Sequence, residues 1–250
     1  MKALKKNWRT CKSLILVVAM VLAGTATFAQ HDIGVYTGIH LGFGQFGADV
    51  EQKIPTYDLT STSSSTYTTY THQIRTNAFA LTPVVGITPF RGHGKPLVDK
   101  LAFEFSLAMQ FGQKYSWGWG EVATTEIRPG VLAKFNVSIA DWANLLDTTS
   151  PAWGDKLVTF GGIGFGIPIR TAKLSYSSAY KQTFEQYEAL GVKVDLPDTK
   201  TTKGGFQILM EYGLGLQVND KFSLNWTIAG LGFIGHFTYS MTIGGNYHFE

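Results

Sequence analysis

Residues 101–111 read Leu-Ala-Phe-Glu-Phe-Ser-Leu-Ala-Met-Gln-Phe. A repeat of two residues places alternate side chains on opposite faces of a strand, and this stretch alternates along its whole length. The even positions are small or polar and include Glu104. The odd positions are all large and apolar: Leu101, Phe103, Phe105, Leu107, Met109 and Phe111. The stretch therefore predicts a β-strand with one face suited to hydrocarbon and one suited to polar groups.

The rest of the chain repeats this pattern. Including the stretch above, eight segments alternate in this way, and each is long enough to cross a bilayer as a tilted strand, which takes about 9–11 residues. In the sixth segment Ile208, Met210 and Leu214 share the apolar face with their alternating neighbours, and we expect that face to contact lipid. The expected strands are 33–46, 75–90, 101–111, 126–137, 157–170, 206–218, 222–234 and 237–249.

A sheet that faces lipid cannot leave edge amides unpaired, because no water reaches them, and only closure pairs every strand. An even number of antiparallel strands also brings both chain ends to one side of the membrane. The sequence therefore predicts an all-β fold, an eight-stranded antiparallel transmembrane β-barrel. Pro83, Pro129 and Pro168 each remove a ladder hydrogen bond, so we expect them at bulges near strand ends.

Charged side chains recur on the polar faces of neighbouring strands. The interior of an eight-stranded barrel is just wide enough to be filled by side chains, so we expect these charges to pair and close the lumen. An alternative is a narrow ion or proton path, since charges within a membrane often mark one. On the first interpretation, neutralising Glu104 alone leaves a cation unpaired and destabilises the barrel. The lumen network comprises Glu104, Glu126, Arg128, Lys134, Arg170 and Glu211.

The connections alternate in length. Those at 48–71, 112–124 and 171–204 are long, whereas those at 91–99 and 219–221 are short. With a periplasmic N-terminus the long ones lie outside the cell, where loops on a rigid scaffold commonly bind partners. We expect 48–71 to be a polar, mobile loop. Short helices are expected at two places: 141–146 within the connection 138–156, and a segment capped by Ser178 and ended by Gly191.

The first 29 residues have the features of a secretory signal peptide. A basic segment precedes an apolar run from Leu14 to about Ala23, and Thr27 and Ala29 supply the small residues of a cleavage site. We expect residues 30–250 to form the barrel domain. Removing five basic residues lowers Lys plus Arg from 21 to 16 against 18 acidic residues, so the mature charge is −2. Cys11, the only cysteine, lies within the expected signal peptide.

The signal ending Phe28-Ala29-Gln30, the glycine-rich segment after Asp32 and the alternating final strand together resemble the PorT-like family, small outer-membrane β-barrels of the Bacteroidetes. The resemblance implies an outer-membrane location and a scaffold, surface-binding or secretion-accessory role. It also implies outer-membrane lipids, the barrel-assembly machinery and an extracellular or periplasmic protein as partners. Such barrels usually end on an aromatic residue that the assembly machinery reads, whereas here Phe249 is followed by Glu250.

Two other functions remain open. Gly235-His236-Phe237-Thr238 looks like the His-x-Ser motif of outer-membrane lipid A deacylases, with threonine as the nucleophile. Alternation turns His236 and Thr238 toward the lumen, away from lipid chains, so we expect no enzyme. A secreted lipocalin-like barrel would instead turn its apolar face inward around a ligand. The six histidines lack metal-ligand spacing and no basic patch suggests nucleic acid, so we expect no cofactor, metal or nucleic-acid partner.

Overall fold

The computed structural model describes residues 33–56, 66–91, 98–188, 198–230 and 238–249, so the expected signal peptide lies outside the described residues. Two helices are described, α2 (Ile139–Leu145) and α3 (Ser178–Glu188). The described strands are β1 (Gly34–Thr56), β2 (Thr66–Thr88), β3 (Leu101–Gly112), β4 (Tyr115–Trp117), β5 (Gly120–Ser138), β6 (Leu157–Gly166), β7 (Ile169–Tyr176), β8 (Thr199–Gly204), β9 (Gln207–Asn219), β10 (Phe222–Ala229) and β11 (Thr238–Phe249).

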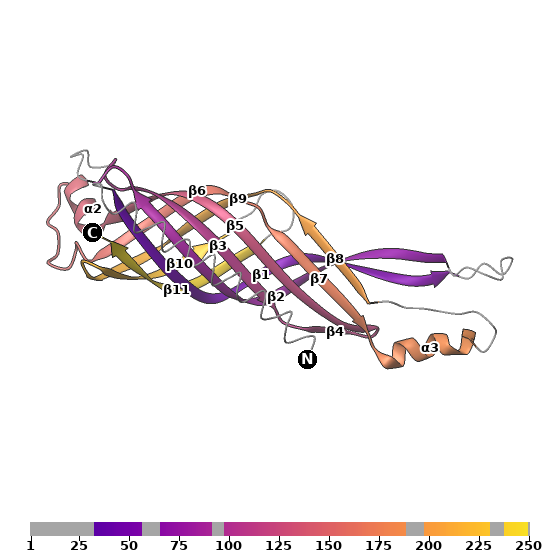
Figure 1. Cartoon of the computed structure of the whole chain (residues 1–250). Coiled ribbons are helices and arrows are strands. Elements are labelled where there is room, and N and C mark those ends of the chain that lie inside the picture. Colours follow the sequence, from indigo (N-terminus) through magenta and orange to yellow (C-terminus); the bar gives the residue numbers. More distant parts are fainter. Residues whose placement is uncertain (1–32, 57–65, 92–97, 189–197, 231–237, 250) are drawn as a thin grey trace.

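Eight of these strands close into a ring. Following hydrogen-bonded neighbours, β1 pairs with β2, then β3, β5, β6, β9, β10 and β11 follow, and β11 pairs with β1 again. Every pairing is antiparallel, and the strands cross the barrel at a tilt (Figure 1). The predicted eight-stranded antiparallel barrel is confirmed. The central part of each of the eight predicted segments falls in a strand of this ring.

The long connections contain much more regular structure than predicted. The expectation of a mobile loop at 48–71 is wrong for 48–56 and 66–71, because β1 and β2 pair without a break from Gly34↔Thr88 to Thr56↔Thr66. Residues 57–65 lie outside the described residues. Residues 66–71 are all threonine or tyrosine, which are polar yet favour strands. Likewise β4 and the start of β5 occupy most of 112–124, and most of β7 together with α3 and β8 lies within 171–204.

These additional elements form what we call the extension: β1 from Phe46, β2 up to Ala78, β4, β5 up to Thr124, β7 from Thr171, α3 and β8. Figure 1 shows it projecting from one end of the barrel. Val35, near the start of β1, and Phe249, the last residue of β11, pair at the opposite end, which we call the turn end. The extension has an apolar core of its own, formed by Phe46, Ala48, Val50, Ile74, Ala78, Val122, Ala172, Leu174 and Tyr176.

Each of the three prolines lies where the pairing with one neighbouring strand is interrupted. Pro83 falls in a gap between β2 and β3, and Pro129 of β5 lies opposite the break that separates β6 from β7, where Pro168 is found. Ile167 donates its backbone N–H to the Pro129 carbonyl across that break, at 3.0 Å. The prediction that all three prolines lie near strand ends is therefore wrong for Pro83 and Pro129, which lie inside the long strands β2 and β5. At each of these prolines the ladder lacks one hydrogen bond, and the strand continues on both sides of it.

Both predicted short helices are present, with one correction. Ser138 and Asp141 form a reciprocal capping box at the start of α2. In α3 the backbone N–H of Tyr180 donates to the side chain of Ser177 at 3.1 Å, so Ser177 provides the cap and not Ser178, which is the first helical residue. Gly191, the predicted end of α3, lies outside the described residues.

Candidate functional site in the barrel lumen

The outer wall of the ring is apolar. Of the nine residues predicted to face lipid, Phe105 is 53% exposed, Phe111 and Leu214 are also exposed, and Leu101, Phe103, Leu107, Ile208 and Met210 are half-buried. Large apolar side chains on the other ring strands are exposed in the same way: Ile39, Leu41, Phe43, Phe79, Ile127, Phe135, Ile163, Phe165, Tyr212, Leu216, Leu224, Trp226, Met241 and Ile243. We call this outer surface the apolar belt.

Met109 is the exception among the residues predicted to face lipid, because it is only 6% exposed. Its ladder partners are Leu81 on β2 and Ile127 on β5. Alternation places Met109 on the outer face, but a flexible thioether chain can pack against apolar neighbours of similar size on both sides. The direction of the side chain follows from the pattern, whereas its exposure depends on neighbours that only the register brings together.

Three of the predicted lumen charges form one cluster nearer the turn end, the lower ion cluster. Lys134 donates to Glu104 at 3.0 Å and also donates to Glu211. The Lys134 ammonium lies 4.5 Å from the centre of the Phe160 ring, a favourable cation–π contact. Tyr36 donates its hydroxyl proton to Glu104 at 2.9 Å. All three charged side chains are buried, and Glu104 is 0% exposed.

The other three form the upper ion cluster, nearer the extension. Arg170 donates from Nε to Glu126 at 2.7 Å, and Arg128 Nη1 lies 3.7 Å from the same carboxylate. Thr238 donates to Glu126 at 3.3 Å and accepts a hydrogen bond from Gln110 at 3.3 Å. One buried carboxylate thus contacts two buried guanidinium groups.

The two clusters together are neutral, but each carries a net charge. The lower cluster has two carboxylates and one ammonium, and the upper cluster has one carboxylate and two guanidinium groups. A cavity of about 20 Å³ lined by both clusters has room for a single water molecule. Below the lower cluster a cavity of about 460 Å³ lies at the turn end, and above the upper cluster begins the apolar core of the extension. Side chains therefore fill the lumen between these two regions.

The pairing differs from the prediction in one respect. Because Lys134 contacts two carboxylates, neutralising Glu104 leaves Lys134 paired with Glu211 and strands no cation. The expectation that neutralising Glu104 leaves a cation unpaired is therefore wrong. The ions whose removal leaves like charges together are Lys134 in the lower cluster and Glu126 in the upper cluster.

Several polar residues of the lumen were not singled out from the sequence. They are Tyr36, Gln110 and a pair in which a ring nitrogen of His40 lies 3.0 Å from the Asn246 side-chain oxygen. All occupy the polar face of their strands, so the alternation of apolar and polar residues was enough to predict that they face the lumen. Glycines make room for the rings: a Cβ on Gly86 would lie 1.9 Å from the Tyr36 ring. That small–large pairing joins different strands and is invisible before the register is known.

The polarity of the two faces reverses where the strands leave the ring. On β1 the outward side chains change from Ile39, Leu41 and Phe43 to Gln45, Asp49, Glu51 and Lys53. The inward side chains change the opposite way, from His40 to Phe46, Ala48 and Val50. On β5 and β7 the outward Ile127 and Ile169 give way to Thr125, Glu121 and Lys173, while the inward Glu126 and Arg170 give way to Val122 and Leu174.

This reversal identifies two environments along single strands. Apolar groups face outward in the ring, which suits a lipid solvent, and inward in the extension, which suits water. A lipocalin-like barrel would require the opposite arrangement in the ring, with Phe105 buried and Glu104 exposed. The described ring is therefore that of a barrel that spans a membrane. Neither described helix has the length and apolar run that crossing a membrane would require.

The candidate nucleophile of the deacylase hypothesis lies inside this network. Thr238 is 0% exposed, and its hydroxyl group is hydrogen-bonded to both Glu126 and Gln110. His236 and Glu250, the other two members of that hypothesis, lie outside the described residues. Within the described ranges no group of three histidine, cysteine, aspartate or glutamate side chains is placed to hold a metal ion.

No protein-family model and no curated protein sequence matches the chain. Solved structures with a similar fold include Ail, the attachment invasion locus protein of Yersinia pestis (11% identity over 86% of this chain and 98% of that chain, TM-score 0.42). Neisserial surface protein A is similar at 9% identity, 87% and 97% coverage and a TM-score of 0.43. The N-terminal β-barrel domain of Pseudomonas aeruginosa OprF is similar at 9% identity, 86% and 97% coverage and a TM-score of 0.38. At these values the likeness carries no information on function.

Proposed function

We propose that the protein is a non-conducting barrel of a bacterial outer membrane that displays the extension outside the cell as a surface-binding scaffold. The observation that carries the proposal is the combination of a filled lumen and a strand-built extension. A pore would need an open axis, whereas here two buried ion clusters and an apolar core occupy it. The resemblance to PorT-like barrels of the Bacteroidetes, and assembly by the barrel-assembly machinery, belong to this proposal.

The extension is held together as one body, which suits a binding scaffold. The described pairing of β1 with β11 ends at Phe46. Beyond that residue, side chains from β7 and β8 contact the backbone of β1. The Tyr176 hydroxyl accepts from the Lys53 backbone N–H at 2.9 Å, and Thr199 donates to the Glu51 carbonyl at 2.6 Å. Lys203 of β8 forms an ion pair with Asp49 at 2.8 Å. These contacts cover part of a strand edge that would otherwise invite unspecific pairing.

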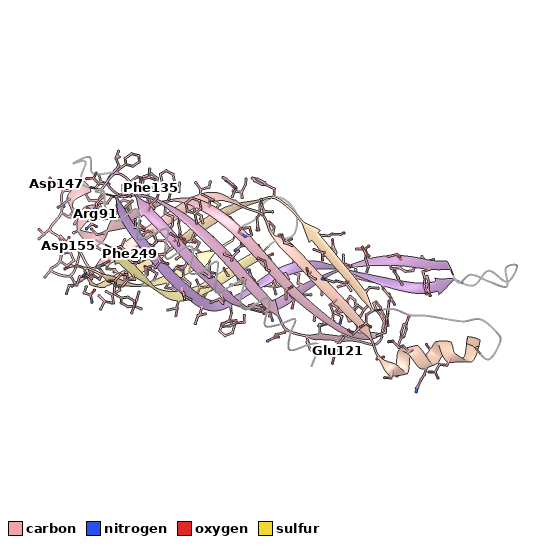
Figure 2. The ribbon with its side chains drawn as sticks, viewed as in Figure 1. Arg91, Glu121, Phe135, Asp147, Asp155 and Phe249 are labelled. Carbon is pink, nitrogen blue, oxygen red and sulfur yellow. The ribbon has the colours of Figure 1, made fainter. Side chains whose placement is uncertain are left out.

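Barrels in which both ends of the chain lie in the periplasm place their longer connections outside the cell. The described ends of the ring, Val35 and Phe249, lie at the turn end, so the proposal places the extension at the cell surface. Figure 2 shows Glu121 at the extension and Asp155 at the turn end, on opposite sides of the barrel. Both side chains are exposed, and Cys11 is the only native cysteine.

Surface labelling of two cysteine variants tests this placement. In intact cells a maleimide reagent too large to cross the outer membrane should label Glu121→Cys and leave Asp155→Cys unlabelled until the envelope is permeabilised. Labelling of Asp155→Cys alone in intact cells would reverse the orientation, and recovery of the protein in the soluble fraction would end the proposal. The purified barrel should show no conductance steps in a planar bilayer, because the lumen is filled.

A photoreactive crosslinker attached to the same two cysteines tests the binding role. On intact cells the Glu121→Cys variant should give discrete crosslinked products with a surface partner. The Asp155→Cys variant, with the crosslinker attached after permeabilisation, serves as the matched control for contacts at the turn end. If the Glu121→Cys variant gives no product that the control lacks, the extension is not a binding surface under those conditions of growth, and the scaffold role loses its support.

A further inference from the structure

The connection between β5 and β6 carries large apolar side chains on its surface. Leu145 and Leu146 are each 68% exposed, Trp153 is 55% exposed and Trp142 is also exposed. The buried side chains of α2 are the small ones, Ala140 and Ala143. A helix at a protein surface normally buries its large apolar residues and exposes polar ones. Here the order is inverted, so the large apolar face of α2 has no protein covering in the described structure.

The geometry of α2 is fixed by contacts with the barrel. The capping box of Ser138 and Asp141 sets its first turn, and Lys100 forms an ion pair with Asp141 at 2.8 Å. Burial raises the pKa of Asp141, but hydrogen bonds from Lys100 and Ser138 outweigh it and hold the pKa below its ordinary value. The backbone N–H of Ala140 donates to the Gly154 carbonyl at 3.1 Å. The exposed apolar face is therefore held in a defined place.

That place is the lower rim of the apolar belt. The indole N–H of Trp142 donates to Thr159 at 2.9 Å, and the Thr159 hydroxyl donates to the Val137 carbonyl at 3.0 Å. Thr159 and Val137 lie on the outward side of β6 and β5, in ladder register with each other. Trp142 thus lies against the outer wall of the barrel, where the exposed Phe135 of β5 and Ile163 of β6 continue the belt upward.

We propose that Trp142, Leu145, Leu146 and Trp153 form an anchor that inserts into the lipid leaflet at the turn end, at the boundary between headgroups and acyl chains. This inference rests on the proposed membrane location and adds a lipid-binding surface outside the strands. Tryptophan favours that boundary because its ring is apolar and its N–H is polar, and leucines on a short interfacial helix reach the first part of the acyl chains. The occupant is lipid because Trp142 joins the anchor to the belt that lipid covers.

Tryptophan quenching by brominated lipids tests the anchor. The mature chain has five tryptophans, so variants that keep only Trp142, only Trp153 or only Trp226 are made by changing the others to phenylalanine. Each variant is refolded into phosphatidylcholine vesicles brominated either near the glycerol end or near the methyl end of the acyl chain. Trp226, exposed on the outer face of β10, is the control for insertion of the barrel itself.

The anchor predicts that Trp142 and Trp153 are quenched most strongly by bromines near the glycerol end and are protected from aqueous acrylamide. Changing both Leu145 and Leu146 to serine should weaken that quenching and leave Trp226 unchanged. If Trp226 is quenched by lipid while Trp142 and Trp153 are quenched only by acrylamide, the barrel is inserted and the anchor is wrong. That result would indicate that the apolar face of α2 is exposed to water and free to bind a soluble partner. If Trp226 is not quenched by either lipid, the membrane location itself fails.

Discussion

Replacing Lys134 with methionine should destabilise the barrel by about 3–5 kcal/mol, the range for breaking a buried ion pair by removing one partner. Methionine keeps much of the volume but leaves the carboxylates of Glu104 and Glu211 buried with no cation between them. The free energy of unfolding is measured by urea titration in lipid vesicles, followed by tryptophan fluorescence. Loss of the compact band on an unheated SDS gel gives a second readout.

The matched control is Lys114→Met. Lys114 and Glu121 form an ion pair at 3.2 Å on the surface of the extension, and such exposed pairs contribute about 0–1 kcal/mol. A further variant that combines Lys134→Met with Glu104→Gln and Glu211→Gln removes the stranded charges and should recover most of the loss. If Lys134→Met costs no more than Lys114→Met, the lower ion cluster does not stabilise the lumen.

Replacing Glu126 with glutamine should have a similar effect in the upper cluster, again about 3–5 kcal/mol. Glutamine is nearly isosteric, so packing is preserved, but Arg128 and Arg170 lose the buried carboxylate that both of them contact. The hydrogen bond from Thr238 also loses its charged acceptor. Urea titration under the same conditions measures the change.

Glu121→Gln is the control for this second variant, since it removes a carboxylate with an exposed partner. The pairing in the two clusters also predicts which variant is less stable. Glu126→Gln should lower the free energy of unfolding more than Glu104→Gln, because Lys134 remains paired with Glu211 when Glu104 is neutralised. Equal losses for Glu104→Gln and Glu126→Gln would contradict the pairing described for the two clusters.

Alternation along the strands was sufficient to predict the ring, because period two is a local property of the sequence. The direction of Phe105 and Glu104 follows from parity alone, and so does the burial of all six lumen charges. Which charges meet depends on register between strands distant in the chain, such as Lys134 on β5 and Glu211 on β9. No local pattern contains that information. The incorrect expectation that neutralising Glu104 leaves a cation unpaired has this cause, because the second partner of Lys134 lies on a strand distant in the sequence.

The extension was missed for a different physical reason. Its strands bury small or apolar side chains inward and expose threonine, lysine and glutamate, so the segment 48–71 has the overall polarity of a loop. Alternation persists there, however: Ala48, Val50 and Gln52 are buried while Asp49, Glu51 and Lys53 are partly exposed. The pattern is that of a strand in water. Its outward residues are polar, so the segment lacks the apolar outward face that marks residues 101–111 as a lipid-facing strand.

The most direct test of the account is the environment of four outward positions on β1. Nitroxide labels are placed, one at a time, on cysteines at Ile39, Phe43, Glu51 and Lys53, and their collisions with oxygen and with a water-soluble nickel chelate are compared in lipid vesicles. The reversal of polarity predicts that oxygen, which concentrates in lipid, dominates at Ile39 and Phe43, and that nickel dominates at Glu51 and Lys53. Equal nickel access at all four positions would contradict a membrane boundary between Phe43 and Glu51.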